Sequence, residues 1–169
     1  MTSVFYTHDQ YVYDQVWLSV IDQDSVVFKV RACSDVHIGL ARYPGISYVE
    51  MYEIVIGGWD NTKSVIRTGM QQQTPEAELD ESDTVSCEQS RHFWVSWVDG
   101  RIAFGRGTTV GAREMLHWQD PNPHEVTAVG ITNAADYNGT WEFGLPTRKY
   151  FNFLPTYSLY QCGTQGQSE

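Results

Sequence analysis

The segment HWQDPNPHEV, which begins at His117, concentrates side chains that could bind a hard cation. Gln119, Asp120 and Asn122 supply carboxamide and carboxylate oxygens, the ligand atoms that calcium prefers. The two prolines of the segment restrict the backbone, so less entropy is lost when an ion binds. The segment therefore predicts a calcium site. A turn that only ends one strand and begins the next explains the same residues, and both interpretations stay open.

A second group of oxygen ligands stands in NAADYNGT, where Asp136 and Asn138 precede a glycine in the order that calcium loops use. The predicted metal ligands are Asp120, Asn122, Gln119, Asp136 and Asn138. The two loops flank one expected strand, EVTAVGIT, and should lie at its opposite ends. One ion could use both only if the strand bends or a partner chain contributes. Asn138 also begins a glycosylation sequon, and a glycan there would exclude it from metal binding.

Aromatic side chains near these loops could hold a sugar. A calcium ion with open coordination positions accepts two sugar hydroxyls, while a neighbouring ring packs on the apolar C–H face of the sugar. The predicted sugar-binding residues are the rings of Trp118, Tyr137 and Trp59 and the polar residues Asp60 and Asn61. A tryptophan beside a strand end is more often buried, so a core role is the alternative for the tryptophans.

The residue types Gln, Asp, Pro and Asn are those that calcium-dependent lectins use, although the order here differs from the motifs of the C-type family. By this chemical analogy, a pair that lacks Glu favours galactose-type sugars. The residues thus predict a non-enzymatic, calcium-dependent lectin for terminal galactose on a glycan or glycoprotein. A lectin that crosslinks cells needs more than one site, so a homodimer is expected.

The elements that must position these residues are strands. In SVVFKVRA, the apolar Val26, Phe28 and Val30 alternate with outward positions, the period of a strand with one buried face. In HFWVSWVDGRIAFGRG, two alternating runs meet at Asp99-Gly100, which is typical of a tight hairpin. Helical spacing is nearly absent. The pattern predicts an all-β fold, a single antiparallel β-sandwich domain with little helix.

One domain is expected over residues 1–169, with an N-terminal strand extension at 1–25, a core at 26–144 and an aromatic tail at 145–169. The acidic segment 71–83 predicts a solvated loop. Three scattered cysteines, Cys33, Cys87 and Cys162, predict at most one disulfide and no zinc site.

Five blocks in order carry a resemblance to a known family: FKVRACSDVHIGL, YEIVIGGWDNTKSVIR, FWVSWVDGRIAFGRG, HWQDPNPHEVTAVGITN and GTWEF. Over roughly residues 26–144 the chain resembles the domain named after farnesoic acid O-methyltransferase, found in invertebrate multidomain and secreted proteins. The name implies methyl transfer from S-adenosylmethionine. Gly57-Gly58, the one glycine pair that could cradle that cofactor, precedes a strand rather than a helix, so a turn or bulge is expected. The chain is thus expected not to be an enzyme. The remaining alternatives are the methyltransferase and a protein-interaction module without a small ligand.

Charge and hydropathy exclude other classes of partner. The formal net charge of −10 repels phosphate backbones, so nucleic acid is not expected as a partner. No apolar run is long enough to span a bilayer, so membrane insertion is not expected. The first 20 residues show no secretory signal, although a lectin would be expected to act outside the cell.

Overall fold

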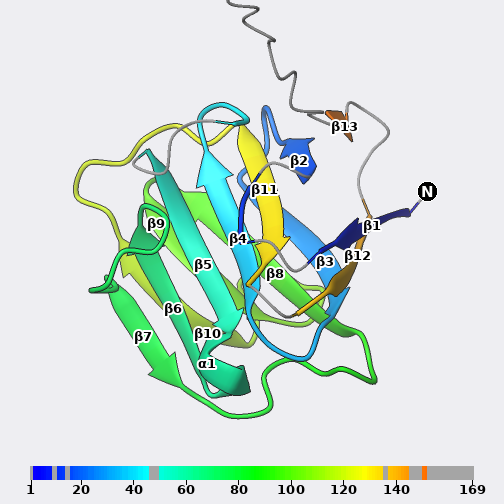
Figure 1. Cartoon of the computed structure of the whole chain (residues 1–169). Coiled ribbons are helices and arrows are strands. Elements are labelled where there is room, and N and C mark those ends of the chain that lie inside the picture. The colour runs from blue at the N-terminus through cyan, green and yellow to red at the C-terminus, as the bar shows by residue number, and fades with distance from the viewer. Residues whose placement is uncertain are drawn as a thin grey trace, which may run out of the picture.

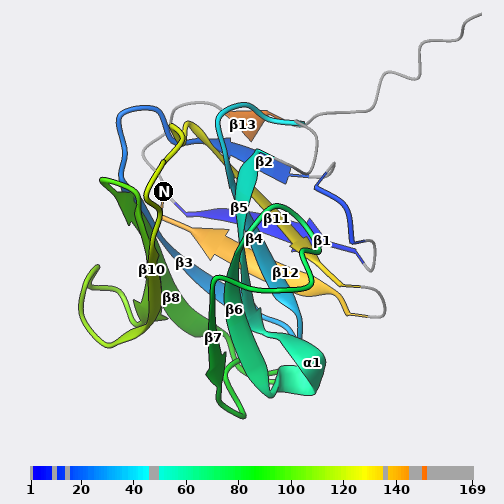
Figure 2. The same cartoon turned by 90° about the vertical axis from the view of Figure 1, so that its left-hand side faces the viewer.

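The structure is a computed structural model of the 169-residue chain and describes residues 2–8, 11–13, 16–45, 50–134, 137–144 and 150–151. Two antiparallel sheets stack face to face, which confirms the predicted β-sandwich (Figures 1 and 2). The one helical element of the described residues, α1 (Gly58–Asn61), is a single turn at one end of the sandwich (Figure 1). No helix in the described ranges is long and apolar enough to cross a membrane.

The six-stranded sheet has the order β1-β12-β3-β8-β9-β10. Its strands are β1 (Ser3–Thr7), β12 (Gly139–Phe143), β3 (Ser25–Arg31), β8 (Arg91–Val98), β9 (Arg101–Arg106) and β10 (Glu114–Gln119). The seven-stranded sheet has the order β13-β2-β11-β4-β5-β6-β7. Its strands are β13 (Tyr150–Phe151), β2 (Val16–Ser19), β11 (Ala128–Asn133), β4 (Val36–Ala41), β5 (Met51–Gly57), β6 (Lys63–Thr68) and β7 (Ala77–Asp80).

The main core lies between the sheets and is built by the alternation that the sequence predicts. Val26, Phe28 and Val30 of β3 are buried, while Lys29 and Arg31 point out of the sandwich. Phe28 packs against aromatic rings from β8 and β12, with ring centroids 5.5 to 6.0 Å apart. These rings all come from the six-stranded sheet and form the aromatic centre of its inner face. Each contributes by burial at about 25 cal/mol per Å² of apolar surface removed from water.

The predicted hairpin between β8 and β9 is confirmed. Asp99 and Gly100 have positive φ angles of 49° and 75°, the left-handed pair that a tight two-residue turn requires. Gly100 is needed for a second reason, because a Cβ atom there would lie 2.7 Å from Cβ of Pro123. The hairpin turn and the proline loop therefore pack against each other at one end of the sandwich.

The segment 71–83 corrects the sequence prediction, because it contains strand β7 as well as loop. β7 pairs with β6 at the edge of the seven-stranded sheet. Its four residues alternate between half-buried and exposed, with Glu78 and Asp80 facing outward. Short, charged edge strands discourage pairing with other chains, and so few apolar positions hide the strand period in the sequence.

Two of the connections between the layers meet at the end that carries α1. Cys33 lies between β3 and β4, and Cys87 lies between β7 and β8. Each cysteine therefore lies in a connection that passes from one sheet to the other. A disulfide joins these two cysteines across 54 residues of sequence. This is the one bridge that the cysteine pattern allowed, while Cys162 lies outside the described residues.

Candidate functional site

The predicted ligand residues fall at two opposite ends of the sandwich. The Trp59 end is formed by α1 and by Tyr137 and Asn138 before β12; the Asp120 end is formed by residues 120–127 and the β8–β9 turn. Strand β11 separates them, and its six residues span roughly 20 Å at the usual rise. The predicted metal ligands therefore do not assemble around one ion within this chain. Asp136 lies outside the described residues.

At the Trp59 end, three consecutive residues adopt a left-handed backbone. Trp59, Asp60 and Asn61 have φ angles of 50°, 57° and 62°. Non-glycine residues pay of order 1–3 kcal/mol each for such a conformation, and runs of them are maintained only where the surroundings hold them. Gly57, two positions before this run, also has a left-handed backbone with φ 61°, and a Cβ atom there would lie 2.6 Å from Oδ1 of Asn61. The prediction that Gly57 and Gly58 form a turn is confirmed.

The side chain of Asn61 helps to keep this left-handed backbone in place. Its Oδ1 atom accepts hydrogen bonds from the backbone N–H groups of Thr84 and Val85, both at 3.0 Å. Its Nδ2 atom donates to the carbonyl of Val85 at 2.9 Å, and its backbone N–H donates to Oγ of Ser34. Asn61 thus anchors the turn, and its amide is engaged with the protein rather than presented to a ligand.

Trp59 and Asp60, in contrast, face outward. The Trp59 side chain is 53% exposed, and the ammonium of Lys63 lies 5.9 Å from its ring centroid. Oδ1 of Asp60 accepts a hydrogen bond of 3.0 Å from the hydroxyl of Tyr137. This bond joins the α1 turn to the loop before β12. Two predicted sugar ligands that are 77 positions apart, Asp60 and Tyr137, are thereby in contact, and Trp59 is the sequence neighbour of Asp60.

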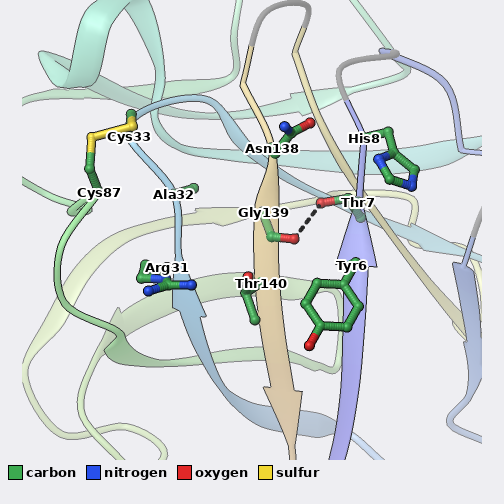
Figure 3. A pocket seen from close by; sticks show the side chains of 10 residues that line it. All are labelled: Tyr6, Thr7, His8, Arg31, Ala32, Cys33, Cys87, Asn138, Gly139 and Thr140. Carbon is green, nitrogen blue, oxygen red and sulfur yellow. Dashed lines mark hydrogen bonds between the residues drawn. A yellow bond between two sulfur atoms is a disulfide. The ribbon is translucent and has the colours of Figure 1, made fainter.

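A pocket of about 520 Å³ opens beside this end on the outer face of the six-stranded sheet (Figure 3). Three neighbouring strands present one residue each in a row: Arg31 from β3, Thr140 from β12 and Tyr6 from β1. Asn138, His8 and the Cys33–Cys87 bridge form its upper rim in Figure 3. This Arg31 pocket adjoins the Trp59 end because Asn138 directly follows Tyr137.

At the Asp120 end, the predicted calcium loop is a well-bonded turn. Oδ1 of Asp120 accepts the backbone N–H of Asn122 at 2.8 Å, and Oδ2 accepts the hydroxyl of Tyr52 at 2.6 Å. The amide of Gln119 donates to the carbonyl of Asp99 at 3.0 Å. These bonds fit the turn interpretation. A carboxylate offers about four acceptor positions, so the two bonds do not use up the capacity of Asp120.

Trp118 sits beside this turn with its ring half-buried. The ring packs against the main core and meets Tyr52 edge-on, with ring centroids 6.2 Å apart. This packing fits the core alternative. No group of three or more His, Cys, Asp or Glu side chains within the described ranges is arranged to hold a metal ion.

A buried polar cluster on the outer face of the seven-stranded sheet was not predicted from the sequence. At its centre Glu53 of β5 is fully buried, and Nε of Arg67 on β6 lies 2.7 Å from its Oε2. The hydroxyls of Tyr11 and Tyr13 donate to Oε1 at 2.8 and 3.0 Å, so the N-terminal segment covers the cluster. The sequence signal for this cluster is one charged residue inside each of two otherwise uncharged strand segments, Glu53 in MYEIVIG and Arg67 in SVIRT.

His37 of β4 completes this Glu53 cluster. Its Nδ1 lies 3.1 Å from Oε1 of Glu53, and its buried Nε2 has no hydrogen-bond partner in the structure but lies 3.8 Å from Oδ1 of Asp35. Burial alone lowers the pKa of His37, but Asp35 and Glu53 raise it above the usual 6.5. Burial likewise opposes ionisation of Glu53, yet contact with His37 and the charge of Arg67 bring its pKa down to about 2. The two groups therefore stabilise each other's charged form.

Comparison with known proteins places the fold in a family. A family model described as farnesoic acid O-methyl transferase matches residues 7–146. The chain belongs to this family. The match begins nearer the N-terminus than the resemblance at residues 26–144 and so takes in β2 as well as the central strands.

The chain also matches individual proteins. "Uncharacterized protein 5" of Haliotis asinina is 29% identical over 122 residues, which are 72% of this chain and 69% of that protein. Among solved structures, the calcium- and mannose-bound lumenal domain of VIP36 is 7% identical, with 90% of this chain and 77% of that chain covered, at a TM-score of 0.48. A β-1,3-1,4-glucanase from a mouse hindgut metagenome is 12% identical, with 83% and 98% covered, at a TM-score of 0.47. Likenesses this weak carry no argument about ligands.

Proposed function

We propose that this chain is a non-enzymatic carbohydrate-binding module, a lectin, whose sugar site is the Trp59 end. The observation that carries the proposal is the exposed Trp59 ring on a left-handed turn, beside the Tyr137–Asp60 pair. Such strain gathers where the backbone must present a side chain in a fixed direction. Here the side chain presented is a large flat apolar surface.

The groups around the ring suit a sugar. An indole face packs on the apolar C–H face of a pyranose, and carboxylate, hydroxyl and ammonium groups accept from or donate to its hydroxyls. The carboxylate of Asp60 keeps acceptor positions beyond the one that Tyr137 uses, and the ammonium of Lys63 lies 5.9 Å from the centroid of the Trp59 ring. Because the turn is already held by Asn61, little ordering entropy is lost on binding.

Calcium, galactose specificity and the homodimer stay predictions. A calcium ion on Gln119, Asp120 and Asn122 would lie at the Asp120 end, away from Trp59. Sugar binding at the Trp59 end is therefore proposed to be independent of that ion. The disulfide between Cys33 and Cys87 supports an oxidising compartment, which is where an extracellular glycan-binding protein folds.

The test is glycan-array binding of the Trp59→Ala variant, with Tyr43→Ala as the matched control. Tyr43 is also an exposed ring, at 56%, with Arg42 5.7 Å from its centroid, but it lies at the other end of β5. We expect Trp59→Ala to lose at least tenfold in sugar affinity and Tyr43→Ala to bind like the wild type. Equal binding by both variants would exclude the Trp59 end as the sugar site.

Repeating the array with a chelator distinguishes the two candidate sugar sites, one at the Trp59 end and one at the Asp120 end. Binding that survives chelation and depends on Trp59 supports the proposal. Binding that disappears with the chelator and is unaffected by Trp59→Ala would instead place the sugar at the calcium loop beside Trp118. No detectable binding on the array together with binding of S-adenosylmethionine in calorimetry would favour the methyltransferase. No binding in either experiment would favour a protein-interaction module.

A further inference from the structure

The Arg31 pocket contains a guanidinium without a carboxylate partner. Lys29, two residues earlier on the same face of β3, pairs with Glu142 at 2.9 Å. Most other described cations are paired in the same way, by Asp or Glu within 3.5 Å. Within the described ranges, only Arg31 and Arg113 have no such ion pair. In a chain with a net charge of −10, an unpaired arginine in a pocket is an exception to be explained.

The residues around Arg31 also lack negative charge. The described residues that line the pocket include no Asp or Glu, although the chain has 21 of them. A second pocket, at the Asp120 end, shows the opposite character, because Asp22, Asp24, Asp99 and Glu125 all line it. Among the described lining residues, an anion in the Arg31 pocket would therefore meet the positive charge of Arg31 and no carboxylate, despite the overall charge of the chain.

The shape of the row suits a sugar rather than a bare ion. Arg31, Thr140 and Tyr6 stand directly opposite one another on neighbouring strands, so the row is about 10 Å wide at the usual spacing between strands. That width accommodates one or two hexose rings. Tyr6 is 65% exposed and offers a ring face, and Thr140 and Asn138 offer hydroxyl and amide groups between it and Arg31 (Figure 3).

We propose that the Arg31 pocket binds the anionic group of an acidic sugar, a sulfate ester or a carboxylate, through the guanidinium of Arg31. The planar fork of arginine can donate two parallel hydrogen bonds to either anion. The Tyr6 ring packs on the sugar, and the rest of the glycan extends past Asn138 toward Trp59. This inference rests on the proposed function and names the class of glycan that the lectin prefers.

The experiment measures binding of four probes by calorimetry to full-length protein made in bacteria, where Asn138 carries no glycan. The probes are a 6-sulfated hexose, a hexuronic acid, their neutral parent hexose and inorganic sulfate. The variants are Arg31→Gln and, as the matched control, Arg113→Gln. Both remove one unpaired positive charge, but Arg113 lies in the exposed connection between β9 and β10.

We expect the wild type to bind at least one acidic sugar about tenfold more tightly than the neutral hexose, with a preference that weakens as salt is added. Arg31→Gln should abolish that preference and leave affinity for the neutral hexose and the melting temperature unchanged. Arg113→Gln should bind like the wild type. A preference for the sulfated hexose alone or for the hexuronic acid alone identifies which of the two anions the pocket accepts.

Three results would overturn the inference. Equal losses in Arg31→Gln and Arg113→Gln would mean that only net charge matters. Inorganic sulfate that binds as tightly as the acidic sugars would mark a simple anion site. Binding of the neutral hexose without any preference for acidic sugars would refute the Arg31 pocket while leaving the proposed function intact, whereas the absence of binding to every sugar would refute the proposed function itself.

Discussion

Arg67 and Glu53 stand directly opposite each other in the pairing of β5 and β6, with Nε of the guanidinium 2.7 Å from Oε2 of the carboxylate. The Glu53 side chain is completely buried. Separating the two groups of such a pair costs free energy, because either group alone would be a buried charge without a counter-charge. It also fixes the N-terminal segment, whose tyrosines donate to the same carboxylate.

Replacing Glu53 with Gln should lower the free energy of unfolding by about 3–5 kcal/mol, because Arg67 and His37 lose their counter-charge. The matched control is Glu142→Gln, which breaks the half-exposed pair with Lys29 and should cost at most about 1 kcal/mol. Urea denaturation at neutral pH measures both. Similar losses in the two variants would show that burial adds nothing to the Glu53 pair.

Stability should depend on pH in both directions. The pKa of Glu53 falls from 4.5 to about 2 on folding, so its contribution is present above 4.5 and is lost as the pH falls toward 2. The pKa of His37 is raised above 6.5, so its contribution is complete below 6.5 and is lost as the pH rises through the folded value. Together these two groups predict the highest melting temperature between about pH 4.5 and pH 6.5. A His37→Gln variant should lose the decline on the alkaline side, and an unchanged alkaline decline would assign it to other groups.

Removing the Cys33–Cys87 bridge should destabilise the fold by about 2–5 kcal/mol, because the bridge closes a long loop in the unfolded chain. The double variant Cys33→Ser/Cys87→Ser tests this in chemical denaturation. Reducing agent provides the control, since it should bring the wild type to the stability of the variant and leave the variant unchanged. A variant as stable as the oxidised wild type would contradict the expectation.

Asp120→Ala should cost about 1–3 kcal/mol even in a chelator, because Tyr52 and the N–H of Asn122 lose their acceptor. If the calcium prediction is correct, added calcium raises the melting temperature of the wild type and leaves that of the variant unchanged. Thermal shift with and without calcium measures both effects. A wild type that does not respond to calcium would make the calcium prediction wrong while the structural role of Asp120 stands.

Local patterns were enough to predict the sheets but not the contacts between distant segments. The alternation in β3 and the Asp99-Gly100 turn are each written within about ten residues, so the sandwich could be predicted. Tyr137 and Asp60 are 77 positions apart, and no local pattern says that they touch. The contacts of Glu53 are even harder to predict, because its partners come from other strands and from the N-terminal segment. A single Glu in an apolar run also produces no periodic pattern.

The bridge between Cys33 and Cys87 has one further consequence. It links two of the connections in which the chain crosses from one layer to the other, on the same rim as Trp59 and the Arg31 pocket. That rim is therefore covalently braced, whereas the Asp120 rim is held by hydrogen bonds and packing alone within the described chain. A protease acting on the intact fold should cut first at the unbraced rim, so that a nicked molecule keeps its sugar-facing side.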